Sequence, residues 1–190
     1  FKGGKGVATA GGVALALEIQ PDQPLCLQIT GVNPDVDPVT ASASVRAEAQ
    51  LPALPHVATA PLWAITSLID VPSPSIGTTV SHQCATRAGT QFWWLSTRTF
   101  GHAIEARLSR AANPLLVNTD WAAPQAIVFE APGFVGFNTM DPLVTACTYV
   151  NMTGQPIRFG TDPQLDDTCE ALGWFFPATA PAACANGPSA

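Results

Sequence analysis

Hydrophobic and polar positions alternate in short runs along this chain, and proline or glycine separates the runs every few residues. Alternation with a period of two places successive side chains on opposite faces of a strand, whereas a helix needs a period of 3.6. The intervening clusters, such as Gln-Pro-Asp-Gln-Pro at 20–24 and Met-Thr-Gly-Gln-Pro at 152–156, are typical of turns. The pattern predicts strands at Val13–Ile19, Leu25–Val32, Val39–Ala49, Leu62–Ile69, Thr78–Cys84, Gln91–Thr99, Ala103–Leu108, Ala126–Phe129, Leu143–Val150, Ile157–Phe159 and Leu172–Phe176.

Many short strands at this spacing indicate an all-β chain folded as an antiparallel β-sandwich or jelly roll with disulfides. The Ala-rich segment 39–50 has a helical alternative, because alanine is the best helix former, but residues 39–45 alternate with period two. Residues 1–12 and 178–190 consist mainly of small residues and proline, so we expect both ends to be extended or mobile unless a partner orders them.

Few residues of the chain are charged. They make up 12% of 190 residues, about half the usual share, and the net charge is −6. Phosphate binding needs clustered Lys and Arg, but the only lysines are Lys2 and Lys5, which excludes nucleic acid as a partner. Gly, Pro, Ser or Asp interrupts every hydrophobic run before the roughly 18 residues that a membrane span requires.

The five cysteines form neither a Cys-x-x-Cys pair nor a Cys/His cluster at zinc spacing. Disulfides in a secreted, extracellular or cell-surface protein are therefore favoured, and buried free thiols in a reducing compartment are the alternative. Because the number is odd, one cysteine stays free or pairs with another chain. Asn151 also begins an Asn-x-Thr glycosylation triplet, of a kind that occurs by chance.

A series of motifs occupies the carboxyl-terminal part of the chain. Residues 147–160 read Cys-Thr-Tyr-Val-Asn-Met-Thr-Gly-Gln-Pro-Ile-Arg-Phe-Gly, residues 166–170 read Asp-Asp-Thr-Cys-Glu, and residues 173–177 read Gly-Trp-Phe-Phe-Pro. The series resembles the end of the copper type II, ascorbate-dependent monooxygenases, the family of peptidylglycine and dopamine hydroxylases. In that family a Cys-x-Tyr strand, an Asn-x-Thr-Gly turn, Phe-Gly and Glu-Met-Cys precede an aromatic strand that ends near proline.

Upstream segments extend the resemblance over roughly residues 12–177. Residues 119–124 fit a Thr-Asp-Trp-x-x-Pro element, residues 96–102 lie where the family has His-x-His, and residues 25–34 are similar to a Leu-Gln-Val-His-Tyr-x-Asn strand. The resemblance implies an arm and first-domain remnant at 1–34, a β-sandwich domain at 35–177, and an Ala/Pro-rich tail at 178–190. It also implies two disulfides, Cys84–Cys184 and Cys147–Cys169, which leave Cys26 unpaired.

The resemblance also shows which ligands are missing. Arg98 and Phe100 stand where the family has two copper-binding histidines, Thr168 stands at the methionine of Glu-Met-Cys, and Thr30 stands at a first-domain histidine. A permanently protonated guanidinium and a phenyl ring cannot ligate copper. These four substituted ligand positions (Thr30, Arg98, Phe100 and Thr168) predict no metal, no cofactor and no catalytic residue.

Two alternatives would still give a metal site. Shifted ligands at His82 or His102 could hold a transition metal, while His56 is expected in a loop. Four acidic residues could bind calcium loosely, although a solvated acidic loop without EF-hand spacing is the favoured interpretation; they are Asp162, Asp166, Asp167 and Glu170.

The environment of the replaced ligands can also be predicted. Burying the Arg98 charge without a partner would cost free energy. We therefore expect Arg98 to pair with Glu130, Asp166 or Asp167, or to reach solvent. We expect Phe100 to pack on Trp93 or Trp174.

These observations predict a secreted, non-catalytic structural or interaction module that contacts copies of itself or other protein chains. The segment Val13–Ile19 could add to a sheet edge of a neighbouring copy and build an oligomer or filament, or it could fold back on its own sandwich. Two other functions stay open, a copper hydroxylase with non-standard ligands and a carbohydrate- or peptide-binding sandwich. The second would use exposed tryptophans among Trp63, Trp93, Trp94 and Trp121.

Overall fold

The computed structural model describes residues 9–10, 13–17, 40, 56–178 and 180–186. Every regular element in these residues is a strand, and no helix there is long and apolar enough to cross a membrane. The strands are β1 (Thr9–Ala10), β2 (Val13–Leu17), β3 (His56–Ile65), β4 (Asp70–Val71), β5 (Ser75–Cys84), β6 (Gln91–Thr99), β7 (Ala103–Arg110), β8 (Asn113–Asn118), β9 (Ala126–Val128), β10 (Leu143–Asn151), β11 (Ile157–Phe159), β12 (Asp166–Asp167), β13 (Cys169–Phe176) and β14 (Ala182–Ala185).

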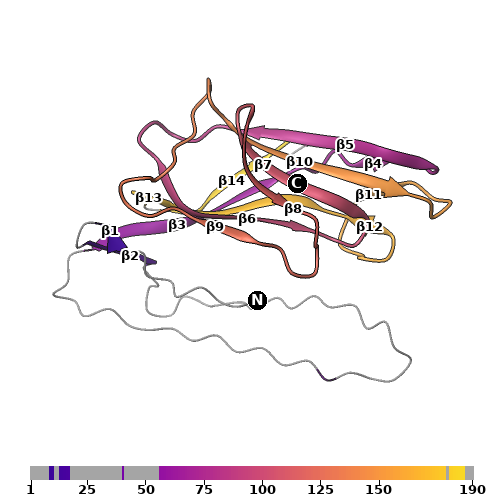
Figure 1. The fold of residues 1–190 in the computed structure, drawn as a ribbon, viewed down its shortest axis with the longest axis horizontal. Coiled ribbons are helices and arrows are strands. Elements are labelled where there is room, and N and C mark those ends of the chain that lie inside the picture. The colour runs from indigo at the N-terminus through magenta and orange to yellow at the C-terminus, as the bar shows by residue number, and fades with distance from the viewer. Residues whose placement is uncertain (1–8, 11–12, 18–39, 41–55, 179, 187–190) are drawn as a thin grey trace.

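Two main sheets pack face to face (Figure 1). The seven-stranded sheet has the order β1-β2-β3-β13-β6-β9, with β14 also paired to β3, and the four-stranded sheet has the order β5-β10-β7-β8. A small third sheet joins β12, β11 and β4. The predicted all-β sandwich is therefore confirmed. Most ladders are antiparallel, but β2 and β14 run parallel to β3, and β12 runs parallel to β11.

Strand β10 shows why alternation predicted the centre of the fold so well. Its residues alternate between buried and half-buried along the whole strand, because one face packs on the seven-stranded sheet and the other faces outward. Strands β6 and β11 begin and end where the pattern placed them.

Several predicted boundaries were wrong. His56 opens β3 and does not lie in a loop, and β13 begins at Cys169 instead of Leu172. The tail predicted at 178–190 contributes β14, whose four residues are mostly alanine and give no alternating signal. The predicted strands Leu25–Val32 and Val39–Ala49 lie outside the described residues, apart from Thr40, and so does the boundary between residues 34 and 35.

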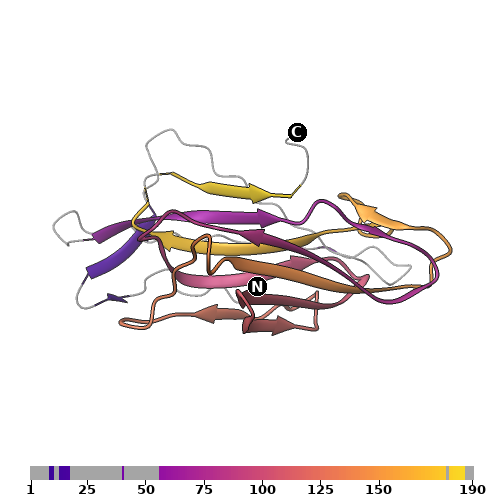
Figure 2. The same ribbon diagram turned by 90° about the horizontal axis from the view of Figure 1, so that it is seen from above.

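The amino-terminal strand folds back on its own chain. Residues Ala14–Leu17 of β2 pair in parallel with His56–Thr59 of β3. Further along β3, Leu62–Ile65 pair with β14, which Figure 2 shows in yellow at one side of the molecule. Segments from both ends of the described chain therefore belong to one sheet.

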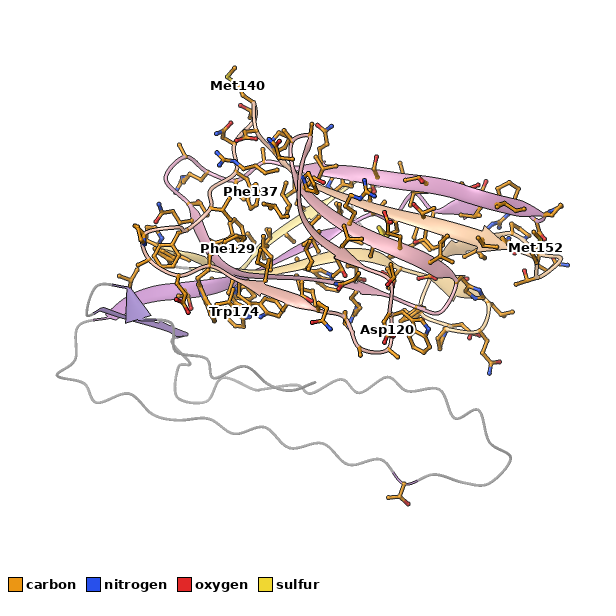
Figure 3. The ribbon with its side chains drawn as sticks, in the orientation of Figure 1. Asp120, Phe129, Phe137, Met140, Met152 and Trp174 are labelled. Atoms are coloured by element: carbon orange, nitrogen blue, oxygen red, sulfur yellow. A yellow bond between two sulfur atoms is a disulfide. The ribbon has the colours of Figure 1, made fainter. Side chains whose placement is uncertain are left out.

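Three apolar clusters hold the sandwich together. The largest lies between the two sheets and contains Phe92, Leu95, Leu108, Phe137 and Leu143. Figure 3 shows Phe137 between the sheets and Trp174 on the far side of the seven-stranded sheet. A second cluster surrounds the buried Cys147–Cys169 disulfide and Tyr149. The third covers the outer face of the seven-stranded sheet with aromatic rings; its members are Val57, Trp93, Trp94, Phe134, Trp174 and Phe176.

Gly173 is required by the close approach of β13 to the core. A Cβ atom at this position would lie 2.9 Å from Leu95 Cδ2 and 2.9 Å from Phe92 Cε1. We expect Gly173→Ala to lower the free energy of unfolding by about 1–3 kcal/mol, because overpacking displaces core rings. Chemical denaturation measures the change. Gly101→Ala is the matched control, since its Cβ would meet nothing closer than 3.4 Å; equal effects of the two substitutions would contradict the packing argument.

Candidate functional site

Two of the four substituted ligand positions converge on one carboxylate. Arg98, near the end of β6, lies opposite Glu170 in the β6–β13 register, and its Nη2 donates to Glu170 Oε1 at 2.9 Å. Arg98 Nε also lies 2.8 Å from Glu170 Oε2. This is an ion-pair contact and not a hydrogen bond, because the N–H group does not point at the oxygen. The Thr168 hydroxyl donates to the same Oε1 atom. Thr30 lies outside the described residues.

Trp63 completes the cluster from β3. Its indole Nε1 donates to Glu170 Oε2 at 2.8 Å, and Arg98 Cζ lies 5.7 Å from its ring centroid, which is within the range of a cation–π contact. Glu170 is only 2% exposed, whereas the Arg98 side chain is 40% exposed and Trp63 is 43% exposed. We call Trp63, Arg98, Thr168 and Glu170 the Glu170 cluster. It presents an indole ring and the edge of a neutralised guanidinium to the outside.

Arg98 pairs with a carboxylate and reaches solvent, as predicted, but the named partners were wrong. The prediction named Glu130, Asp166 and Asp167, but Glu130 is exposed in the turn after β9, and the Asp167 carboxylate is bonded to backbone N–H groups. Glu170 pairs instead because facing residues of adjacent antiparallel strands project from the same face.

The predicted packing of Phe100 was also wrong. Trp93 and Trp174 pack on each other, with their ring centroids 6.5 Å apart. Trp174 faces Trp94 in the register, and Phe100 lies six residues beyond Trp94, or about 20 Å along a strand.

Asp167 is a buried clamp for the turn between β6 and β7. Its Oδ1 accepts hydrogen bonds from the N–H groups of Phe100 and Thr168, both at 2.7 Å. Its Oδ2 accepts from the N–H groups of His102 at 3.0 Å and Ala103 at 3.1 Å. The predicted solvated acidic loop is therefore wrong for Asp167 and Glu170, which are both buried.

Burial has a measurable consequence for the Asp167 pKa. Burial raises this pKa, and the N–H groups of Phe100, Thr168 and His102 oppose the rise without cancelling it. Burial also raises the pKa of Tyr149, with a smaller contribution from the Asp167 charge. Tyr149 belongs to the second apolar cluster, and both side chains are fully buried.

The raised Asp167 pKa predicts a pH dependence of stability. As pH rises, the unfolded chain releases this proton first. The part of the Asp167 contribution that depends on its protonation is therefore complete below the unfolded-state pKa and is lost as pH passes the higher folded-state pKa, while the hydrogen bonds to the N–H groups remain. We therefore expect wild type to exceed Asp167→Ala in free energy of unfolding by more at pH 3 than at pH 7. Urea denaturation at both values measures this; a gap that widens towards pH 7 would show that the N–H groups outweigh burial.

His82 and His102 make their hydrogen bonds to residues outside the Glu170 cluster. His102 contributes its backbone N–H to Asp167, and His82 Nε2 lies 3.1 Å from Cys184 Sγ. Across the described ranges, no three His, Cys, Asp or Glu side chains form a group that could hold a metal ion.

One of the two implied disulfides is present. Cys147 of β10 and Cys169 of β13 are bonded, with their Cα atoms 5.9 Å apart, and join the two main sheets. Cys84 and Cys184 are free thiols in the structure, although both line the same cavity. Cys26 lies outside the described residues.

The tryptophans named by the sequence differ in exposure. Trp63 is 43% and Trp121 38% exposed, Trp94 is half-buried, and Trp93 is buried. A flat row of exposed indole rings is therefore not formed by these four residues, and Trp63 is the one that lies in the Glu170 cluster.

Sequence reasoning missed the central role of Glu170. The available signal was its position two residues after Thr168, which gives both side chains the same face if the strand extends that far back. It missed Trp63 as a donor to that carboxylate because the pairing of β3 with β13 joins residues 107 positions apart in sequence. No protein-family model matches the chain, and no curated protein matches it significantly.

Proposed function

We propose that this chain is a secreted, non-catalytic interaction module, related to the second domain of the copper type II monooxygenases, that contacts protein chains through the surface around Trp63 and Arg98. One observation carries the proposal. The side chains at two substituted ligand positions, Arg98 and Thr168, donate to the buried Glu170 carboxylate, and so does Trp63. Each group in this cluster has its polar partner within the cluster.

The electrostatics of the cluster support a structural role. A guanidinium is a permanent cation that repels metal ions and offers no lone pair. The buried Glu170 carboxylate has its charge compensated by the Arg98 guanidinium and accepts from two neutral donors, Thr168 and Trp63. The partly exposed indole and guanidinium belong to the residue types that are enriched at protein interfaces.

Secretion is the localisation that the cysteines favour. The Cys147–Cys169 bond is fully buried and joins the two main sheets. Structural disulfides of this kind persist mainly in oxidising compartments.

Copper binding tests the non-catalytic part of the proposal. Because free thiols bind copper, they are alkylated beforehand. We then expect Cu(II) added to the purified chain to give no stoichiometric binding by calorimetry, and copper plus ascorbate to give no oxygen uptake above a blank without protein. Arg98→His with Thr168→Met is the matched variant, since it restores the two ligand types. Tight stoichiometric copper binding by the unmodified chain at the Glu170 cluster would overturn the proposal.

Self-association tests the interaction part. We expect light scattering after size exclusion to give a mass above the 19.8 kDa of one chain at high concentration. Trp63→Ala should shift it towards one chain, whereas Ile76→Ala, an 81% exposed residue on β5 of the other main sheet, should not. A single-chain mass at all concentrations would rule out self-assembly and leave other chains as partners.

A further inference from the structure

The two free thiols, Cys84 of β5 and Cys184 of β14, differ in how deeply they are buried. Cys84 ends β5, an edge strand of the four-stranded sheet, and is 2% exposed. Cys184 lies in β14, which pairs with β3 of the seven-stranded sheet, and is half-buried. Both residues line one cavity, and Cys184 Sγ lies 3.9 Å from the carbonyl oxygen of Gln83, the residue before Cys84, so a bond between the two sulfurs would join the edges of the two sheets.

His82 distinguishes one thiol from the other. It lies two residues before Cys84 on β5, and its Nε2 is 3.1 Å from Cys184 Sγ. At this distance the ring nitrogen can accept the thiol proton of Cys184. Burial lowers the pKa of His82, which keeps the imidazole neutral and able to accept that proton. Burial and the neighbouring Cys184 raise the pKa of Cys84, so the Cys84 thiolate is hard to form.

A cavity of about 170 Å³ opens onto both sulfur-bearing residues. Thr86, Arg87, Thr90 and Phe175 also line it. Arg87 is exposed and is the one charged residue among the lining residues. The cavity is therefore suited to the reacting end of a small molecule with a negative charge.

We propose that Cys184, His82 and Cys84 form a thiol-modification site for anionic low-molecular-weight disulfides, in which Cys184 reacts first and Cys84 then resolves the adduct. Cys184 gives its proton to His82 Nε2, and its thiolate attacks one sulfur of the disulfide RSSR. The old S–S bond breaks, a Cys184–SR bond forms, and the leaving RS⁻ takes the proton from His82 to become RSH.

The second step closes the pair. Cys84 loses its proton and attacks Cys184 Sγ, which forms the Cys84–Cys184 bond and releases the second RS⁻ to be protonated by that proton. In total the two protein thiols lose two electrons and two protons, and RSSR becomes two RSH. The product fixes β14 covalently to β5, in addition to its short parallel ladder with β3.

Glutathione disulfide is the probe for the test. All variants carry Cys26→Ser, because that residue lies outside the described residues, and intact-mass analysis first confirms that Cys147–Cys169 remains oxidised. We expect the parent chain to end as a Cys84–Cys184 disulfide, and Cys84→Ala to stop as a single glutathionyl adduct that peptide mapping places on Cys184. Cys184→Ala should react at Cys84 at least about tenfold more slowly, and His82→Gln should slow the reaction by a similar factor.

Two controls separate this asymmetry from misfolding and from general reactivity. In urea, where His82 no longer lies beside Cys184, the Cys84→Ala and Cys184→Ala chains should react at equal rates. In folded protein, Arg87→Gln should slow the reaction with anionic glutathione disulfide more than it slows the reaction with cationic cystamine. Equal reactivity of the two thiols in the folded chain, an adduct on Cys84 in the parent chain, or an unchanged rate in His82→Gln would each overturn the proposal.

Discussion

Arg98→Met is expected to lower the free energy of unfolding by about 2–4 kcal/mol. Removing one partner of a buried ion pair leaves the other charge uncompensated, and here the remaining Glu170 carboxylate is only 2% exposed. The figure is below that for a fully buried pair because water reaches the 40% exposed Arg98 side chain. Trp63 and Thr168 would still donate to the carboxylate, but neither carries a charge.

A double variant separates loss of charge balance from loss of packing. Glu170→Gln keeps an amide oxygen that can accept from Trp63 or Thr168 and removes the charge that Arg98 neutralises. We expect Arg98→Met with Glu170→Gln to be more stable than Arg98→Met alone, as measured by urea denaturation. The matched control is Arg107→Met, which breaks an exposed pair with Glu105 at 2.8 Å and should cost less than about 1 kcal/mol. A double variant less stable than Arg98→Met would show that packing, not charge, dominates.

The local pattern predicted strands for two different reasons. Strand β10 alternates between buried and half-buried residues, as a strand with two different faces does. Strand β6 is buried on both faces over most of its length, and its concentration of aromatic and threonine residues placed it instead. Strand β14 was missed because alanine gives no contrast between faces, and its position depends on the β3 edge. The early start of β13 was missed for a related reason, since Asp166, Asp167 and Glu170 suggest an exposed loop until their partners are known.

The sequence could predict where the candidate site lies, but not which residues contact one another in it. The resemblance brought Arg98 and Thr168 to one place, and strand pairing puts both beside Glu170. The identity of the carboxylate depends on register, because a shift of one residue exchanges the two faces of a strand. The partners of Asp167 are backbone N–H groups, which every residue type except proline carries, so no sequence signal could have identified them.

Asp167→Ala should have the other large effect, a loss of about 3–5 kcal/mol in the free energy of unfolding. The substitution leaves four backbone N–H groups without their acceptor, and a buried donor that loses its partner costs about 1–3 kcal/mol. The cost is less than the full sum because the donors at Phe100 and His102 are only partly buried and can bind water. Asp166→Ala is the matched control, since the neighbouring side chain is half-buried and accepts none of these bonds.

The position of the damage distinguishes this explanation from a general loss of stability. The four donors belong to the turn from Phe100 to Ala103 and to Thr168, so hydrogen exchange should accelerate at these amides more than along β10. The same turn follows Arg98 on the chain, and Thr168 donates to Glu170, so the Glu170 cluster should loosen with it. Unchanged hydrogen exchange at Phe100, His102 and Ala103 in Asp167→Ala would mean that the carboxylate does not hold the turn. It would also contradict the expected effect of Asp167 on the Glu170 cluster.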